Sequence, residues 1–323
     1  MNTASAKAHT NIALAKYWGK IDEQFNLPAV PSLSLTLNAL WTQTSVQFDD
    51  ALPCDHFTLN EQPASALQLS RVSALLDRVR TRANITSAAR IESFNNFPTA
   101  SGLASSASGF AALAAAATRA ANLDCSLEQL SALARRSSAS AARSVFGGFV
   151  DLKAGIVGDD TLSAAPLNIE PWDIVMMVVI VDTTQKAVGS TKGMNHCAAT
   201  SPYYKEWIHK APQWHEEVRK GVLARDIERV GQAMEASTFA MHACALAADP
   251  ALLYWKPITL AVLRHIHDLR QQDQLQAWCT MDAGPHVKVL CSTQTALTLA
   301  PLLKSIPGVH NVITSEAGPS VQV

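Results

Sequence analysis

The sequence is poor in charged residues, and neither sign of charge is in excess. Charged side chains make up 16% of its 323 residues, and 26 Lys and Arg face 27 Asp and Glu, for a net charge of -1. An average soluble domain has about 25% charged residues. A nucleic-acid-binding protein needs surplus cations to displace counterions from phosphates, so this class is disfavoured. A hydrophobic content of 48% argues against disorder, because this much apolar surface can offset the entropy lost on folding.

The sequence also lacks cysteine pairs, long apolar runs and an export signal. Its six cysteines are scattered without a Cys-x-x-Cys pair, which argues against a disulfide framework and a zinc site. The most apolar short run, residues 174–181, is far below the ~18 residues of a membrane-spanning helix. The first 20 residues contain no continuous apolar core of a secretory signal. We therefore expect a cytoplasmic protein without metal ligands of its own.

Apolar periodicity predicts mixed strands and helices along the whole chain. Leucines at 33, 35 and 37 alternate with polar residues, which is typical of a half-buried strand. Strands are predicted over 32–40, 42–48, 57–59, 85–94, 145–157, 174–181, 275–281 and 286–291, with a final helix–strand pair. Helices are predicted over 66–82, 109–122, 126–136, 202–222, 226–247 and 257–272. The length favours about two domains, so we expect an α+β fold in two lobes, residues 1–184 and 185–323.

A run of small residues separates a predicted strand from an alanine-rich helix. Residues 98–108 read Pro-Thr-Ala-Ser-Gly-Leu-Ala-Ser-Ser-Ala-Ser. Small side chains let the backbone approach a ligand closely, and a helix start supplies free N–H groups and a positive dipole end, which together favour phosphate. This is not the Walker pattern, because no Gly-Lys-Ser/Thr follows. A tightly packed loop whose serines only cap the helix is an equal alternative.

Lysines and a tyrosine cluster near the start of the chain. Residues 11–20 place Lys16, Tyr17 and Lys20 close together. Two ammonium groups and a phenol could hold an anion by charge and hydrogen bonding. An edge strand with surface lysines is the simpler explanation when the segment is taken alone.

An arginine and an aspartate also stand in chemically suggestive surroundings. Arg143 lies in the hydroxyl-rich run 137–144, and a guanidinium fork beside hydroxyl groups suits a carboxylate. A helix end followed by a loop explains that run equally well. Asp282 stands before Gly284 and Pro285, where an aspartate very often serves only the turn.

Taken together, these segments resemble the GHMP family of small-molecule kinases and, within it, the mevalonate diphosphate decarboxylases. The Pro-x-x-x-Gly-Leu-x-Ser-Ser-Ala-Ser run is similar to the family's ATP-phosphate loop. Four segments resemble the decarboxylase branch: Asn-Ile-Ala-Leu-x-Lys-Tyr-Trp-Gly-Lys, Ser-x-Ser-x-x-Arg-Ser-x-x-Gly-Gly-Phe-Val, Ser-Thr-x-Gly-Met and Met-Asp-Ala-Gly-Pro. They follow the family's order over residues 11–285, so the resemblance covers nearly the whole chain.

The resemblance implies a GHMP kinase-like fold with a ferredoxin-like C-terminal lobe and an active site between the lobes. ATP, with Mg²⁺, would phosphorylate the tertiary 3-hydroxyl of mevalonate 5-diphosphate. Loss of phosphate and CO2 would then yield isopentenyl diphosphate in the mevalonate route of isoprenoid biosynthesis. The resemblance also implies a homodimer. A phosphomevalonate decarboxylase, a mevalonate 3-kinase and a non-catalytic nucleotide-binding module are the alternatives.

Roles for individual residues follow from the resemblance. The expected catalytic residues are Asp282 as base or orienter, Arg143 as holder of the substrate carboxylate, and Lys20. The expected substrate-binding residues are Tyr17, Lys20, Arg71, Ser138, Ser140, Arg143, Thr191 and Lys192. The expected ATP-binding residues are Pro98, Ser101, Gly102, Leu103, Ala104, Ser105, Ser106 and Ser108. For the adenine pocket, Asn95 and Asn96 are weaker candidates.

The chain departs from the branch's usual pattern at two places. Where that pattern reads Gly-Ser-Gly-Ser-Ala-Cys-Arg-Ser, residues 137–144 read Ser-Ser-Ala-Ser-Ala-Ala-Arg-Ser. Ser137 and Ala139 thus add a Cβ at positions of glycine, which restricts the backbone and its approach to a substrate. Lys192 stands where arginine is common, which exchanges a planar fork for a point charge. The preferred phosphorylated form of mevalonate therefore stays open.

Overall fold

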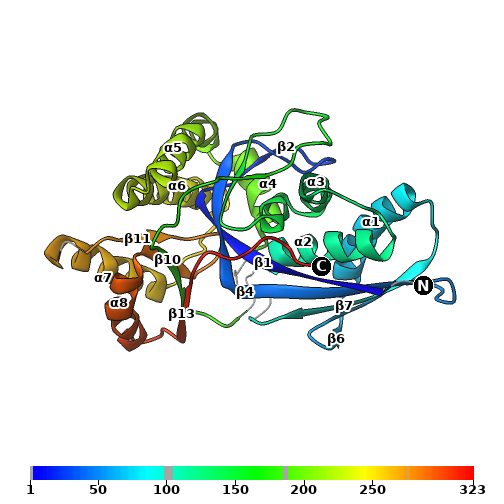
Figure 1. Ribbon diagram of the computed structural model, residues 1–323. Coiled ribbons are helices and arrows are strands. Elements are labelled where there is room, and N and C mark those ends of the chain that lie inside the picture. Colours follow the sequence, from blue (N-terminus) through cyan, green and yellow to red (C-terminus); the bar gives the residue numbers. More distant parts are fainter. Residues whose placement is uncertain (1–2, 98–104, 185–187, 274) are drawn as a thin grey trace.

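The computed structural model describes residues 3–97, 105–184, 188–273 and 275–323 of the chain. Its strands form two main sheets that lie side by side, each covered by helices (Figure 1). None of the helices in these ranges combines the length and the apolar composition that crossing a membrane requires. The expected two-lobed α+β architecture is confirmed.

The long strand β4 (Ser32–Asp49) is the centre of the first sheet. It pairs antiparallel with β1 (Thr3–Ala15) along most of its length, with β8 (Phe149–Leu152) over residues 32–35 and with β7 (Ala88–Asn95) over residues 42–49. Shorter strands extend the two edges: β5 (His56–Leu59), β6 (Gln62–Pro63) and β9 (Ala165–Pro166). The segments expected as separate strands over 32–40 and 42–48 therefore form one continuous strand.

Three helices cover one face of this sheet (Figure 1): α1 (Ala66–Ala83), α2 (Ser105–Ala120) and α3 (Leu127–Ser137). Twelve of the 16 residues of α2 are buried, because its alanines are small enough for the helix to approach the sheet and the 3₁₀ helix η1 (Ala139–Val145) closely. Both α1 and α3 begin with a capping box, in which side chains satisfy the free N–H groups of the first turn.

The second sheet has the strand order β11-β12-β10-β13, and all neighbouring strands are antiparallel. Its strands are β10 (Val175–Ile180), β11 (Ala277–Thr280), β12 (Val287–Cys291) and β13 (Asn311–Ser315), and α7 (Pro257–Asp273) and α8 (Thr293–Ser305) pack on it. This strand–helix–strand–strand–helix–strand arrangement is the ferredoxin-like pattern that the resemblance implies.

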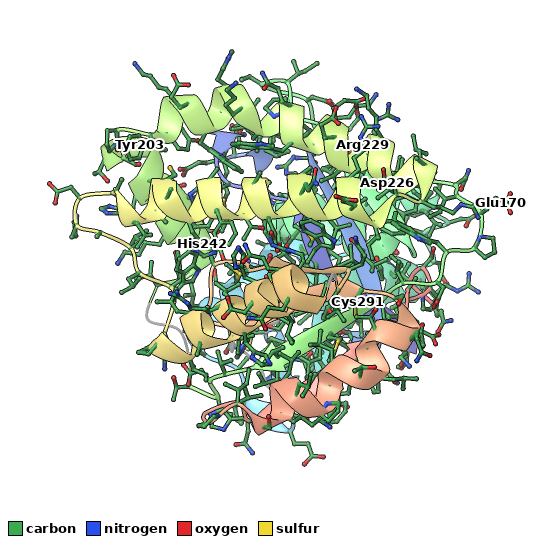
Figure 2. The ribbon with its side chains drawn as sticks, turned by 90° about the vertical axis from the view of Figure 1, so that its left-hand side faces the viewer. Glu170, Tyr203, Asp226, Arg229, His242 and Cys291 are labelled. Carbon is green, nitrogen blue, oxygen red and sulfur yellow. The ribbon has the colours of Figure 1, made fainter. Side chains whose placement is uncertain are left out.

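Helices α4 (Ser190–Thr200), α5 (Tyr204–Ala224) and α6 (Ile227–Leu246) connect β10 to the rest of the second sheet. Figure 2 shows α5 and α6 as an antiparallel pair, with Tyr203 and His242 toward one end and Asp226 and Arg229 toward the other. Helix α6 packs against both β1 and β11, so it contacts both sheets.

An apolar core joins the two sheets. It combines Ile12 and Leu14 of β1 with Met176 and Val178 of β10, and Met234 of α6 packs among them. The C-terminal tail also returns to the first sheet, where the backbone of Gln322 pairs with that of Lys7 (Figure 1). The lobes are therefore packed against each other through a shared core and a shared tail.

Most expected elements are confirmed, but several expectations need correction. The strand expected over 145–157 is wrong at both ends, because η1 ends at Val145 and only β8 is extended. Gly148 has a positive φ of 65°, and a Cβ on Gly147 would lie 2.6 Å from the tail backbone, so this pair of glycines makes a turn packed on the tail. The chain also contains a strand, β1, and a helix, α4, that are absent from the predicted elements. Strand β10 joins the second sheet before residue 184, and the lobe boundary at 184/185 stays a prediction.

Candidate active site

A cavity of about 900 Å³ lies where the end of β1, η1, the start of α2 and the start of α4 meet. Such a volume suits a small-molecule ligand with several polar groups. Most of the predicted site residues line this one cavity: Tyr17, Lys20, Arg71, Ser105, Ser106, Ser138, Ser140, Arg143, Thr191, Lys192 and Asp282. Segments separated by up to 265 residues thus supply one site.

Asp282, which follows β11, is held between two lysines. Its Oδ1 accepts a hydrogen bond from Nζ of Lys16 at 2.8 Å, and its Oδ2 lies 3.1 Å from Nζ of Lys288. The side chains of Lys16 and Lys288 are 1% and 0% exposed, whereas that of Asp282 is 27% exposed toward the cavity. Lys16 follows β1 and Lys288 belongs to β12, so both lobes contribute to the cluster.

These contacts determine the charge of the cluster. Burial by itself would raise the pKa of Asp282, but the two lysines hold that pKa well below its usual range. Burial lowers the pKa of Lys16 to about 8, and the Asp282 charge limits that decrease. Asp282 is therefore a fixed negative charge at neutral pH, and Lys16 loses its proton about one pH unit above neutral.

Arg143 is a buried cation whose hydrogen-bond partners are all neutral. It comes from η1, and its Nε donates to Oγ of Ser34 at 3.0 Å and to Oδ1 of Asn11 at 3.3 Å. Its Nη1 donates to Oγ of Ser32 at 2.6 Å. Burial lowers its pKa to about 10, so it remains protonated at neutral pH. Within the described ranges no carboxylate forms an ion pair with it, so its charge suits an anionic ligand in the cavity.

Two serine hydroxyl groups and a second arginine line the same cavity as Arg143. The Oγ atoms of Ser138 and Ser140 are 3.0 Å apart and face the same cavity. Arg71 of α1 donates from Nη2 to the backbone oxygen of Ser137 at 3.1 Å and lies over the ring of Phe110, 4.8 Å from its centroid. The guanidinium of Arg71 is thus held by α2 and by the end of α3, and its remaining N–H groups can donate to a ligand.

Tyr17 and Lys20 lie on the wall between β1 and the short strand β2 (Lys20–Asp22), which pairs with β3 (Leu27–Pro28). Burial raises the pKa of Tyr17, so its hydroxyl stays a neutral donor, and it has no partner in the described part of the chain. Burial lowers the pKa of Lys20. Thr191 and Lys192 are exposed on the first turn of α4, across the cavity.

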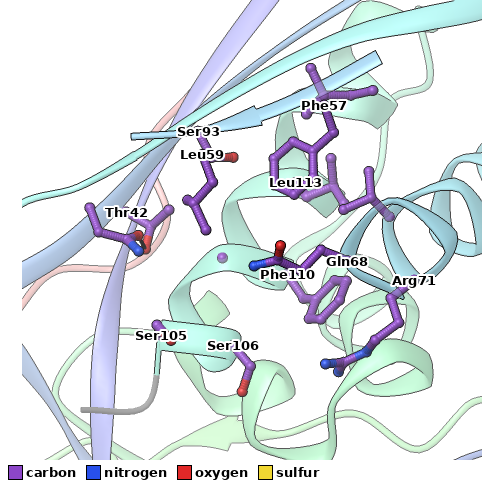
Figure 3. A pocket seen from close by; sticks show the side chains of 14 residues that line it. Thr42, Phe57, Leu59, Gln68, Arg71, Ser93, Ser105, Ser106, Phe110 and Leu113 are labelled. Carbon is purple, nitrogen blue, oxygen red and sulfur yellow. Dashed lines mark hydrogen bonds between the residues drawn. The ribbon is translucent and has the colours of Figure 1, made fainter. Parts of the chain in front are cut away.

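The start of α2 borders a second, mainly apolar cavity of about 170 Å³ (Figure 3). Ser105 and Ser106 line both cavities, and Figure 3 shows Arg71 reaching from α1 toward the same end. Side chains such as Phe57 and Leu59 make this cavity suitable for a flat apolar group. Asn95 lines this cavity, whereas Asn96 does not. The side chain of Asn96 instead accepts a hydrogen bond from the backbone N–H of Trp41 and donates one to the backbone oxygen of Ala39.

One expected ATP-binding residue lies away from both cavities. Ser108 is completely buried, and its Oγ is 2.7 Å from Oγ1 of Thr42, which donates to Oδ1 of Asn95 at the same distance. Its side chain therefore secures α2 against the sheet. The other expected residues of this loop lie outside the described residues: Pro98, Ser101, Gly102, Leu103 and Ala104.

The structure adds polar residues that the sequence pattern does not identify. Ser32, Ser34 and Asn11 hold Arg143, and Lys288 contacts Asp282. The sequence offers one hint of the role of Lys288, namely that this lysine interrupts the apolar run 287–291. Strand alternation alone predicts that its side chain faces solvent. The serines alternate with leucines and look like the solvent side of a half-buried strand.

Comparison with known proteins agrees with this geometry. A model of the diphosphomevalonate decarboxylase-like N-terminal domain matches residues 8–163, and one of the mevalonate 5-diphosphate decarboxylase C-terminal domain matches residues 176–320. The chain is 33% identical to a diphosphomevalonate decarboxylase of Candida albicans over 90% of this chain and 84% of that protein.

Solved structures are similar over the whole chain. The mevalonate diphosphate decarboxylase of Staphylococcus aureus is 37% identical, with a TM-score of 0.93 over 99% of this chain and 97% of that one. A protein designated MDDEF, in complex with MVAPP, AMPPCP and magnesium, is 38% identical with a TM-score of 0.92 over 99% and 98%. This chain belongs to the diphosphomevalonate decarboxylase family.

Proposed function

We propose that this chain catalyses the ATP-dependent decarboxylation of mevalonate 5-diphosphate to isopentenyl diphosphate, with ADP, phosphate and CO2 as the other products. One observation carries the proposal: the buried cation Arg143, without a carboxylate partner in the described ranges, faces the same cavity as the fixed anion Asp282. A substrate with a carboxylate beside a reacting carbon needs both. A nucleotide-binding module would need neither.

The first step transfers a phosphoryl group. The 3-hydroxyl oxygen forms a bond to the γ-phosphorus of ATP, the bond to ADP breaks, and the hydroxyl proton passes to a phosphate oxygen or to water. The N-terminus of α2, with Ser105 and Ser106, would bind the phosphates, because its free N–H groups and dipole favour anions. The apolar cavity beside it would take the adenine.

Magnesium fits as a partner of the nucleotide. Within the described ranges no three His, Cys, Asp or Glu side chains are placed to hold a metal, and both oxygens of Asp282 already face lysines. ATP phosphates, water and the hydroxyls of Ser105 and Ser106 would therefore hold the ion. When bound, it neutralises charge on the phosphates.

Asp282 acts through its charge and its orientation. A carboxylate whose pKa lies this far below its usual range accepts protons poorly at neutral pH. We therefore assign it two tasks: orienting the 3-hydroxyl in the first step, and stabilising the positive charge that develops at carbon 3 in the second. This favours the orienting role over that of general base among the roles the resemblance implies.

The second step breaks two bonds. Phosphate leaves carbon 3 with the electrons of the C–O bond, the electrons of the bond between carbons 1 and 2 form the new double bond, and CO2 departs. Arg143, with Ser138 and Ser140, would hold the carboxylate opposite the departing phosphate, as elimination requires. Tyr17, Lys20, Arg71, Thr191 and Lys192 line the same cavity and would bind the diphosphate.

A substrate panel tests the proposal. The protein is incubated with ATP, Mg²⁺ and mevalonate 5-diphosphate, and ADP and CO2 should form in equal amounts. ADP without CO2 would refute decarboxylation and indicate a 3-kinase. A higher kcat/KM for mevalonate 5-phosphate would indicate a phosphomevalonate decarboxylase. The homodimer and the cytoplasmic location stay predictions.

A further inference from the structure

Lys288 is a buried lysine that the reaction described above does not use. It lies within β12 and pairs with Val178 of β10 and Thr280 of β11, in the middle of the second sheet. Its side chain is completely buried, and it is not among the residues that line the cavity. It therefore cannot touch a substrate directly.

Apart from Thr280, which lies opposite it in β11, the sheet neighbours of Lys288 are apolar. It shares a sheet face with Trp278 and Leu290, which belong to the core between the lobes. Its only ion pair within the described ranges is with Oδ2 of Asp282, at 3.1 Å. Burying an ammonium group in such a place costs free energy, and an apolar side chain of similar size would often be neutral or stabilising. Stability alone does not explain this residue.

The two lysines act on different oxygens of one carboxylate. Lys16 bonds Oδ1 from the end of β1, and Lys288 contacts Oδ2 from β12. Contacts on both oxygens from two rigid elements oppose rotation of the carboxylate about its Cβ–Cγ bond. The other titratable groups facing the cluster are Arg143 of η1 and His242 of α6. Burial lowers the pKa of His242 to about 3, so it is neutral and cannot replace Lys288.

We propose that Lys288 is a positioning residue for the reaction: its ammonium fixes Oδ2 of Asp282, so that Asp282 presents one orientation and a full negative charge to the cavity. This inference rests on the proposed function and on the role given there to Asp282. Asp282 keeps Lys16 as a partner when Lys288 is replaced, so the replacement leaves no carboxylate unpaired. The fold should therefore tolerate the change while turnover falls.

The experiment compares Lys288→Met and Lys288→Gln with the wild type, using kcat, both KM values and thermal unfolding. Lys288→Met should lower kcat roughly 10–100-fold, as loss of an outer partner of a functional group does. Both KM values should stay within about threefold, and the melting temperature should not fall. Gln keeps a donor and should recover part of kcat. Lys256→Met, which removes a lysine paired with Asp182 outside the cavity, is the control and should keep wild-type kcat.

A double-mutant cycle separates positioning from a general structural effect. In the Asp282→Asn background, Lys288→Met should change kcat by less than about threefold, because its effect passes through Asp282. If Lys288→Met lowered kcat as strongly in the Asp282→Asn background as in the wild type, the inference would be overturned. An unchanged kcat in both Lys288 variants would also overturn it. If Lys288→Met does not fold, Lys288→Gln enters the same cycle. ADP and CO2 are measured separately: a wild type that forms ADP without CO2 refutes the proposed function, and the Lys288 comparison is then made on ADP formation.

Discussion

The replacement Asp282→Asn tests the electrostatic role of the carboxylate. The amide keeps nearly the same shape but loses the negative charge between Lys16 and Lys288. At an effective dielectric constant of about 20, a unit charge about 4 Å from a developing cation is worth about 4 kcal/mol. That corresponds to roughly a thousandfold in rate. We therefore expect turnover to fall by about 10²–10⁴, with a modest change in ATP affinity because Asp282 does not lie at the start of α2.

The assay measures ADP and CO2 under saturating substrates, together with ATP binding at equilibrium. Asp55→Asn is the matched control: Asp55 is likewise paired with a cation, the half-buried Arg80, and accepts from the backbone of Ala89, but it does not line the cavity. It should lose stability and keep turnover once folded. A turnover of Asp282→Asn within about tenfold of the wild type would refute the electrostatic role.

Three further predictions follow from contacts at the site and in the tail. Arg143→Lys keeps the positive charge but loses the planar guanidinium group that Ser32 and Ser34 hold in place. We expect kcat/KM to fall about 10²-fold and the ratio of CO2 to ADP to drop below one. Equal amounts of CO2 and ADP at the wild-type rate would contradict this prediction. Lys16 has a pKa of about 8 and loses its proton above that pH, so kcat/KM should fall as the pH rises past about 8. In Lys16→Arg this alkaline decrease in kcat/KM should move to higher pH. A decrease at the same pH would mean that another group causes it. Gly147→Ala places a Cβ 2.6 Å from the tail backbone and should cost about 1–3 kcal/mol in urea unfolding, with Gly109→Ala, which has open space, as the control.

Short motifs in the sequence predict most of the site, because each stands where a regular element begins or ends. Lys16 and Tyr17 follow β1, Asp282 follows β11, and Thr191 lies in the first turn of α4. Side chains at the ends of elements can face a shared space between lobes. The family resemblance supplied the pairing of Arg143 with a carboxylate, which residue type alone left undecided.

Local sequence patterns do not predict which polar side chains are buried or which partners they bond. Strand alternation predicts which residues share a face, but not whether solvent or another sheet covers that face. Ser32 and Ser34 look like solvent-facing residues and instead hold Arg143. Ser108 looks like a phosphate ligand and instead bonds Thr42 inside the lobe.

The sequence by itself determined the family, the α+β class, most elements and the set of polar side chains available for chemistry, because these depend on local spacing and motif order. The tertiary structure decided how those charges are arranged. Only the packing of two lobes brings Lys16 and Lys288 to opposite oxygens of Asp282 and leaves Arg143 among neutral partners. The electrostatic energy of a group depends on distances and burial across the whole chain, and so a nearly neutral sequence folds into a strongly cationic site around one fixed carboxylate.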